Sequence, residues 1–268
     1  MFKNILLYPT RLGQQKIGTE LTPLVMKGHI KSTHHIIRTV FLDEIKPIEI
    51  GLHKLYKRNA SLTNPIINIG GDHSMSIATV QDSLNKYPNV KVLWIDAHAD
   101  INTYESSCSK NVHGMPLSIL TGLDPWSSMR FQDRLLPFTN LMYIGVRETD
   151  PFESTLIHRN NINMLSSANI MKNVDVTLDL IEDFIKDAPV HVSFDVDVLD
   201  PMYMPCTGTP VDNGMDINSI KNILDYLVTK NIVNMDITEL NLQLGTDEQK
   251  YASIKTVKHL LEHYIQFK

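Results

Sequence analysis

The chain has 268 residues, of which 43% are hydrophobic and 21% charged, a composition typical of a globular protein with a sizeable core. A net charge of −5 without a basic stripe argues against nucleic acid as a partner, and no apolar run approaches the roughly 20 residues that span a membrane. The two cysteines, Cys108 and Cys206, are too few for a disulfide framework and favour a cytoplasmic location.

Six short runs along the chain are continuously apolar, which predicts strands that are covered on both faces. They span 4–8, 65–70, 90–96, 140–146, 189–197 and 231–240. Predicted helices span 73–87, 115–123, 175–187, 216–230 and 250–266, and two of them begin with the N-cap candidates Asp175 and Asp216. Residues 9–62 show no clear elements, and we assign the cluster "HHIIR" (34–38) to the surface.

Strands that alternate with helices predict an α/β fold with a parallel sheet, and we treat 1–268 as a single domain. In such sheets ligands bind outside the carboxyl ends of the strands. Five of the predicted strands end in unusual polar clusters: "GGDHS", "DAHAD", "RETDPFE", "DVDVLDP" and "TEL". We therefore expect a functional site where these ends meet.

Three of these clusters contain groups that bind metals. The candidate ligands are His73, Asp96, His98, Asp100, Asp195 and Asp197. Four carboxylates that converge unaided would repel one another and lose hydration, whereas two divalent cations would balance their charge. A site rich in oxygen with some imidazole and no thiolate suits Mn²⁺ best, with Fe²⁺, Co²⁺ or Ni²⁺ as alternatives.

Other residues of these clusters have more ordinary interpretations. Gly70 and Gly71 would let the chain turn tightly after its strand. Asp72 would orient a ligand or cap the next helix, and Asp200 would be a turn residue. The six candidate ligands could instead be helix caps and loop carboxylates without a metal. Three such motifs in this order, each after a predicted strand, disfavour that interpretation.

The motifs "GGDH", "D-A-H-x-D" and "D-x-D-x-x-D-P" together resemble the ureohydrolase superfamily, over about residues 64–245. The segment "DINTYESSCSKNVHGMP" (100–116) is similar to the arginase branch. The resemblance implies a three-layer α/β/α sandwich around a mostly parallel sheet of about eight strands. It also implies two Mn²⁺ ions per subunit and hydrolysis of L-arginine to L-ornithine and urea through a metal-bridging hydroxide.

The same resemblance assigns roles to individual residues. Glu239 would pair with the guanidinium group, Asp100 would carry the proton of the hydroxide to the leaving nitrogen, and His113 would exchange protons with solvent. Asp150, with Glu153 assisting, would hold the α-amino group of the substrate. The other substrate-binding candidates are Asn102, Ser107, Ser109 and Asn111, for the carboxylate, and Thr209 in the pocket.

Some positions depart from the usual arginase pattern. Lys110 replaces a small residue, commonly glycine, in the substrate loop, and Leu242 replaces a common proline. Two alternatives stay open: another ureohydrolase, such as an agmatinase, or a catalytically weak relative that binds metal or arginine. A homo-oligomer, either a trimer or a hexamer, also stays open, because the tail that helps some arginases assemble has no counterpart here. Trp94 is expected to lie in the core.

Overall fold

The computed structural model describes residues 2–41, 47–125 and 127–268. Its centre is an eight-stranded sheet in the order β2-β1-β3-β8-β7-β4-β5-β6, in which all neighbouring strands are parallel. The strands are β1 (Asn4–Tyr8), β2 (Ile36–Thr39), β3 (Ile66–Gly70), β4 (Lys91–Ile95), β5 (Leu141–Ile144), β6 (Asn163–Leu165), β7 (Val190–Asp195) and β8 (Ile232–Thr238). The predicted sheet of about eight strands is confirmed.

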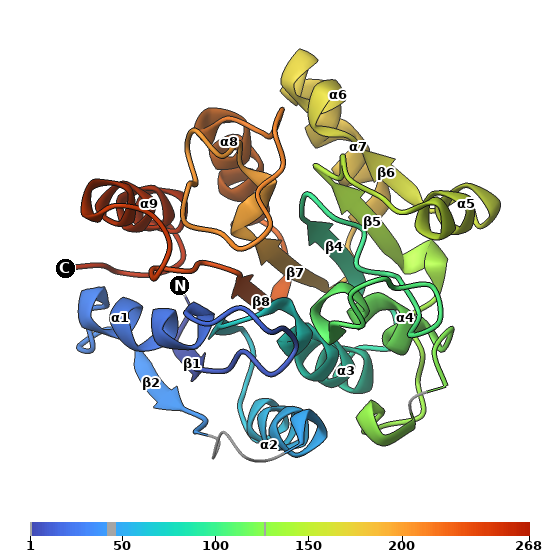
Figure 1. Ribbon diagram of the computed structural model, residues 1–268, viewed down its shortest axis with the longest axis horizontal. Helices are drawn as coiled ribbons and strands as arrows, with labels where there is room; N and C mark the ends of the chain where they lie inside the picture. The colour runs from blue at the N-terminus through green and yellow to red at the C-terminus, as the bar shows by residue number, and fades with distance from the viewer. Residues whose placement is uncertain (1, 42–46, 126) are drawn as a thin grey trace.

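Helices cover both faces of this sheet, which gives the three layers that the resemblance implied (Figure 1). The helices are α1 (Thr22–His29), α2 (Ile48–Ala60), α3 (Ser76–Lys86), α4 (Pro116–Thr121), α5 (Pro151–Arg159), α6 (Ser167–Lys172), α7 (Val174–Ile185), α8 (Ile217–Leu227) and α9 (Asp247–Leu260). One face packs against α1 and α6–α9, and the other against α2–α5.

The central strands are apolar throughout because both of their faces are covered. In β4, Leu93 and Ile95 belong to the core under α7 and α8, whereas Val92 and Trp94 belong to the core under α3 and α4. Successive side chains of a strand point to opposite faces, so neither face of β4 tolerates a polar residue. The continuous apolar runs therefore identified these strands correctly.

The elements that the sequence did not predict are mostly short or lie at the sheet edges. Edge strand β2 has four residues, and β6, at the other edge, has three. The assignment of residues 34–38 to the surface is wrong in part. Residues 36–38 belong to β2, and His35 is buried, with Nδ1 2.8 Å from the carbonyl oxygen of Phe2.

The predicted helices are confirmed with small shifts at their ends. Asp216 is the N-cap of α8, since its side chain accepts from the amide of Ser219. Asp175 is not a cap. Asn173 caps α7 instead, because its side-chain oxygen lies 3.2 Å from the amide of Val176. Within the described residues, no helix combines the length and apolar character needed to cross a bilayer.

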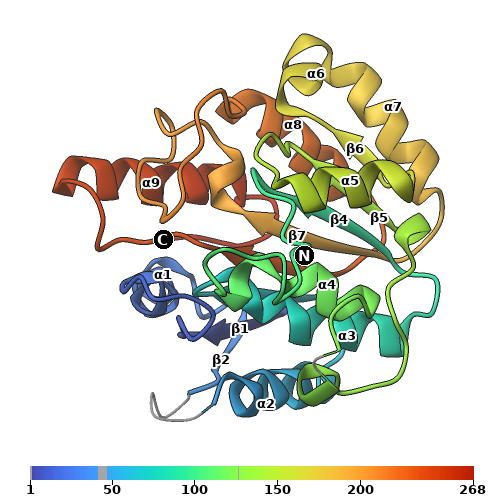
Figure 2. The same cartoon turned by 45° about the vertical axis from the view of Figure 1, so that its right-hand side comes forward.

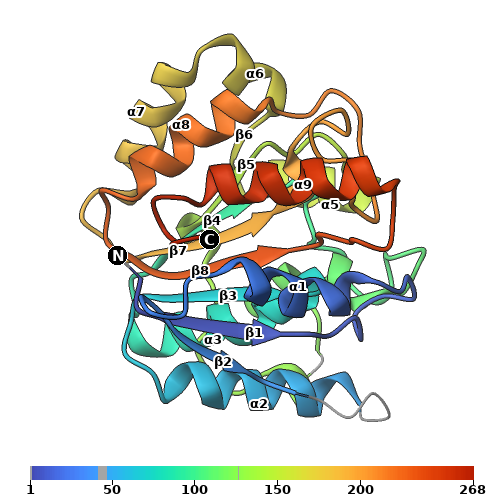
Figure 3. The same ribbon diagram turned by 90° about the vertical axis from the view of Figure 1, so that its left-hand side faces the viewer.

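Parallel pairing places the carboxyl ends of the strands along one edge of the sheet (Figure 3). The four central strands β3, β8, β7 and β4 are neighbours although they are far apart in sequence. The loops after them are the ones that carry "GGDHS", "TEL", "DVDVLDP" and "DAHAD". The sheet topology therefore brings these four clusters together.

Candidate active site

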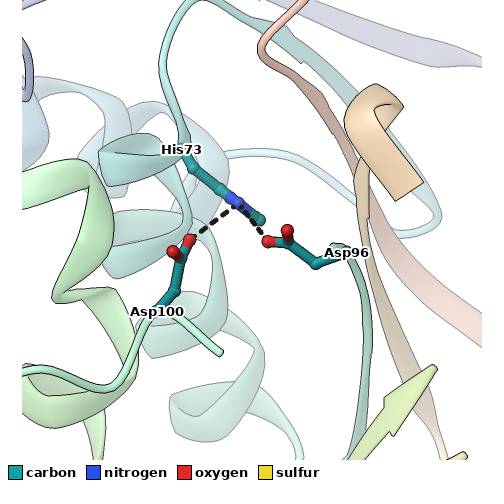
Figure 4. Close-up of side chains that lie close together, drawn as sticks. All are labelled: His73, Asp96 and Asp100. Atoms are coloured by element: carbon teal, nitrogen blue, oxygen red, sulfur yellow. Dashed lines mark ion pairs between the residues drawn. The ribbon is translucent and has the colours of Figure 1, made fainter. Parts of the chain in front are cut away.

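All six predicted metal ligands converge at this edge, in two groups that share Asp96. In the first group, His73 Nδ1 lies 3.0 Å from both Asp96 Oδ2 and Asp100 Oδ2 and 3.2 Å from Asp195 Oδ2. Figure 4 shows the carboxylates of Asp96 and Asp100, from the loop after β4, pointing toward His73, which follows β3. His73 Nδ1 is buried and makes no hydrogen bond of normal geometry, although three carboxylate oxygens surround it.

The second group lies on the other side of Asp96. His98 Nδ1 is 3.1 Å from Asp197 Oδ2 and 3.5 Å from Asp96 Oδ1. Asp96 thus directs one carboxylate oxygen to each group. Two sets of donors that share a carboxylate are suited to holding a pair of metal ions close together.

In "DAHAD" and "DVDVLDP" the candidate ligands stand at every second position, and this spacing has a local physical cause. Asp96 Oδ1 accepts from the amide of His98 at 2.7 Å, and Asp195 Oδ1 accepts from the amide of Asp197 at 2.9 Å. Such turns, in which an Asp side chain binds the backbone two residues on, fix the carboxylate as the strand ends. In both aspartates Oδ1 accepts from the turn and Oδ2 faces His73; Oδ1 of Asp96 also faces His98.

Asp100 adopts a left-handed backbone conformation, with φ of 49°. A residue other than glycine pays about 1–3 kcal/mol for such a conformation, which persists only where the surroundings impose it. The carbonyl of Asp100 accepts from the amide of Leu117 at 3.0 Å, which ties this turn to α4. The strained turn places the Asp100 carboxylate opposite His73.

The directions of the pKa shifts show that this cluster carries excess negative charge. Burial raises the pKa of Asp195 well above its ordinary value, and burial together with the charge of Asp96 raises the pKa of Asp100 to about 6. Burial would lower the pKa of His73 and His98, but the surrounding carboxylates raise both well above normal. Because divalent ions bind the deprotonated forms of these ligands, they would take the place of the protons that the raised pKa values favour.

These observations together fit a binuclear metal site. The donors are carboxylate oxygens and imidazole nitrogens without a thiolate, the unpaired Nδ1 of His73 faces carboxylate oxygens, and two divalent ions would neutralise four carboxylates. Donor sets of this kind suit Mn²⁺ and its neighbours in the first transition row.

Glu239 lies beside the metal-ligand cluster in the loop after β8. Its Oε1 accepts from the amide of His73 at 2.8 Å and lies 3.1 Å from His113 Nδ1. Burial would raise the pKa of Glu239, but His113 and the other donors hold it below its ordinary value. Burial likewise opposes charge on His113, yet Glu239 raises its pKa to about 9. An ionised carboxylate therefore lines the site, as a cationic ligand requires.

Most of the predicted substrate residues lie around a cavity of about 290 Å³ that is also lined by five of the six candidate metal ligands, all except Asp96. Those that line it are Asn102, Ser107, Ser109, Asp150, Glu153, Thr209 and Glu239, together with His113. Asn111 is not among the lining residues. Its backbone N–H donates to Ser109 Oγ at 3.2 Å, and it directly precedes the short 3-10 helix η3 (Val112–Gly114).

Several of these side chains already have partners. Asn102 Nδ2 donates to Asp150 Oδ2 at 2.7 Å. Glu153 accepts from the amides of Asp150 and Ile101, at 2.9 and 3.1 Å. Burial raises the pKa of Glu153 to about 7. Glu153 thus holds together the two loops that flank the outer part of the cavity, and Asp150 is the N-cap of α5.

Lys110, the main departure in the substrate loop, is not among the residues that line the cavity. Its backbone has a φ of 59°, a conformation that explains why glycine suits this position. Its ammonium donates to the carbonyl oxygen of Tyr104 at 2.5 Å and lies 4.8 Å from the centre of the Tyr104 ring. Lys110 therefore folds back over its own loop rather than toward the ligands.

The glycines after β3 serve close packing rather than a turn of positive φ. A Cβ on Gly71 would lie 1.6 Å from the carbonyl oxygen of Thr10, and one on Gly70 would meet the sulfur of Met75 at 1.7 Å. Neither glycine has a positive φ. The chain does bend at Gly71, as predicted, and the close contacts are what require glycine there. Asp72 is a cap, as predicted, since its Oδ1 accepts from the amide of Ser74 at 3.0 Å. Asp200 is a turn residue, also as predicted, since its Oδ1 accepts from the amide of Met202; its Oδ2 accepts from the amide of Gly214, fourteen residues later.

Sequence reasoning missed three residues that hold the metal ligands in place. Trp94 is buried in the core as predicted, but its ring also stacks on His73 with centroids 4.2 Å apart, and its Nε1 donates to Asp96 Oδ2 at 3.0 Å. Ser193 Oγ lies 2.8 Å from His73 Nε2, which leaves Nδ1 as the ligand atom. Arg147 donates to the carbonyl oxygen of Asp197 at 2.9 Å. Ser193 could have been found, because it lies two positions before Asp195 and so on the same face of β7.

The fold and the site define the class: an α/β protein whose parallel sheet carries a candidate binuclear metal site at the carboxyl ends of its central strands. The sequence model of the Arginase family matches residues 12–262. An arginase of Schizosaccharomyces pombe is 31% identical over 290 residues, which cover 96% of this chain and 90% of that one. The protein therefore belongs to the arginase family.

Further comparisons agree with this membership. An arginase of Neurospora crassa is 39% identical over 193 residues, which are 67% of this chain and 54% of that protein, so the match spans about half of that relative. A crystal structure of Entamoeba histolytica arginase in complex with L-ornithine superimposes with a TM-score of 0.88 and 26% identity, over 96% of this chain and 97% of that one.

The second group of donors predicts the effect of changing His98. Replacing His98 by Asn removes an imidazole donor and should lower the manganese retained after dialysis from about two ions per chain to about one. The measurement is metal analysis of the purified protein. The control is His158→Asn, since His158 is exposed on α5. Unchanged metal content in the His98 variant would show that the ligand set is wrong.

Proposed function

We propose that this protein hydrolyses the guanidinium group of L-arginine to L-ornithine and urea at a pair of Mn²⁺ ions. The observation that carries the proposal is that one cavity contains both the two metal-ligand groups and the ionised Glu239, with Asp150 on its wall. Membership of the arginase family supports it independently.

One metal ion would be held by His73, Asp96, Asp100 and Asp195, and the other by His98 and Asp197 with Asp96 shared. When bound, such a pair supplies a water nucleophile that is activated near neutral pH. The residues of the chain then have to bind the guanidinium group, direct its carbon toward that nucleophile, and move protons.

Glu239 is the counter-charge of the guanidinium group. A guanidinium is planar and presents pairs of N–H groups to a carboxylate, so a fixed Glu239 sets the plane of the substrate. Asp100 also lines the cavity and is placed to carry a proton to the leaving nitrogen. His113 contacts Glu239 and lines the cavity, where it is placed to exchange protons with solvent.

The outer part of the cavity would bind the amino-acid end of arginine. Asp150 would accept from the α-ammonium group, and the hydroxyls of Ser107 and Ser109 would donate to the α-carboxylate. Asn102 orients Asp150 through their hydrogen bond of 2.7 Å. Glu153 acts through the backbone of the same two loops, because amide donors occupy both of its oxygens.

A second candidate function is hydrolysis of a decarboxylated guanidine such as agmatine. One observation favours it: the amide nitrogen of Asn102 is engaged by Asp150, and Asn111 is not on the cavity wall, so fewer side-chain donors face an α-carboxylate. Asp150 could accept from either compound, since agmatine keeps the ammonium group and lacks only the α-carboxylate. The hydroxyls of Ser107 and Ser109 on the cavity wall favour arginine, because only arginine has a carboxylate for them to donate to.

We also propose a cytoplasmic location and a homo-oligomer, either a trimer or a hexamer. The location is supported by the two unpaired cysteines, Cys108 and Cys206. Sedimentation of the purified, metal-loaded protein tests the oligomeric state.

The two candidate functions differ in substrate preference. With Mn²⁺ present, the purified protein should release urea from L-arginine with kcat/KM at least about tenfold above that for agmatine, because only arginine has an α-carboxylate that can accept from Ser107 and Ser109. Urea release from both compounds, measured in parallel, checks this. Equal or faster turnover of agmatine would contradict the arginine assignment and support the second candidate.

Asp150→Asn isolates the charge of the α-ammonium partner. Asparagine caps a helix as well as aspartate does, so α5 should remain intact. We expect the KM for arginine to rise about tenfold with little change in kcat, because a charge-assisted hydrogen bond is lost. Steady-state kinetics give both constants. Asp216→Asn, a change at the N-cap of α8 outside the cavity lining, is the matched control and should leave the KM unaltered.

A further inference from the structure

The N-terminal loop after β1, residues 10–18, contacts the site, although no sequence motif indicates this contact. Figure 2 shows this dark-blue loop beside the green loop that follows β4. The carbonyl oxygen of Gly13 accepts from the amide of His113 at 3.1 Å, and the amide of Gly13 donates to Asp72 Oδ2 at 2.9 Å. The loop is thus bonded to the "GGDH" motif and to the substrate loop.

The contact between the loop and the "GGDH" motif leaves no space for side chains. A Cβ on Gly13 would lie 2.5 Å from Asp72 Oδ1, and a Cβ on Gly71 would overlap the carbonyl oxygen of Thr10. The amide of Asp72 donates to that same carbonyl at 3.2 Å. The position of the loop relative to the metal ligands is therefore closely fixed.

Gln14 extends from this loop to Glu239. Its Nε2 donates to Glu239 Oε2 at 2.7 Å, and its side chain is buried. The carboxylate can only accept, so the amide nitrogen and not the amide oxygen faces it. Gln14 is not among the residues that line the cavity, so it holds Glu239 from behind. The other oxygen of Glu239 faces His73 and His113.

Glu239 needs such support because its own backbone is strained, with a φ of 64°. The residues after it are braced by the same N-terminal region. Asn241 Nδ2 donates to the carbonyl oxygen of Ile17 at 2.9 Å, and Thr22 Oγ1 donates to that of Leu240 at 2.5 Å. The N-terminal region therefore supports both the backbone that follows Glu239 and the Glu239 side chain.

We propose that Gln14 is a positioning residue for the guanidinium group of the substrate. It fixes the direction of the Glu239 carboxylate, and through it the plane in which a guanidinium group is bound. This inference rests on the proposed function, because it assigns Glu239 to the guanidinium group.

The test is Gln14→Ala in the metal-loaded full chain. The kcat/KM for L-arginine should fall about tenfold to a hundredfold, because a hydrogen bond to a buried charge is lost. The inhibition constant of L-ornithine, which has no guanidinium group, should change less than about threefold. Gln15→Ala is the matched control, since Gln15 is the exposed neighbour of the same type, and it should behave as wild type.

A second variant separates the hydrogen bond from packing. Gln14→Met keeps the length of the side chain and removes the donor, so it should lose activity as Gln14→Ala does. Wild-type kinetics in either variant, or an equal loss of ornithine and arginine binding, would overturn the inference.

The wild-type measurement tests the proposed function separately. If wild type cleaves agmatine instead of arginine, the arginine assignment fails, and the same variants are compared with agmatine, which has the same guanidinium end. If wild type cleaves neither compound, the proposed function and this inference fail together.

Discussion

The repulsion among buried carboxylates at one edge of the sheet is the constraint on which the rest of the structure depends. Four aspartates lie close together at this edge and are almost entirely buried: Asp96, Asp100, Asp195 and Asp197. The two imidazoles, even when protonated, do not balance the charge of four carboxylates. The same carboxylates raise the pKa of both His73 and His98. A pair of divalent cations would resolve this imbalance, and the chain has two groups of side chains that could hold them.

The fold contributes rigidity to this arrangement. Each ligand follows a buried strand, and the aspartates are fixed by amides two residues further on. Trp94 and Ser193 hold His73 from two sides, and Arg147 fixes the backbone at Asp197. A ligand set supported in this way keeps its geometry despite its charge, which is what a metal site requires. Glu239 lies at the same edge, where we propose that it binds the guanidinium group of the substrate.

The sequence was sufficient to predict that the candidate metal ligands converge, because each follows the carboxyl end of a strand in a parallel sheet; that they bind metal stays a prediction. It was also sufficient for the central strands, whose two covered faces require continuous apolar residues. It failed at β2 and β6, since short edge strands have no such requirement. It also failed at Gln14, because a single glutamine in a loop has no signature until the fold brings it 2.7 Å from Glu239, 225 positions later.

Some predicted roles changed once contacts were known. Glu153 accepts hydrogen bonds from two backbone amides, Asn102 orients Asp150, and Lys110 folds back over its own loop. Motif matching assigns residues to a pocket by position, but only the contacts show whether a side chain has lone pairs or hydrogens free for a ligand.

The central claim is that the six ligands exist to hold two metal ions that make guanidinium hydrolysis feasible. Calorimetric titration of the metal-free protein with Mn²⁺, with urea release from L-arginine followed in the same samples, tests it most directly. The account predicts a stoichiometry of about two ions per chain, with activity that rises as the second ion binds. Full activity without metal, or saturation with no ion bound at the cluster, would contradict it.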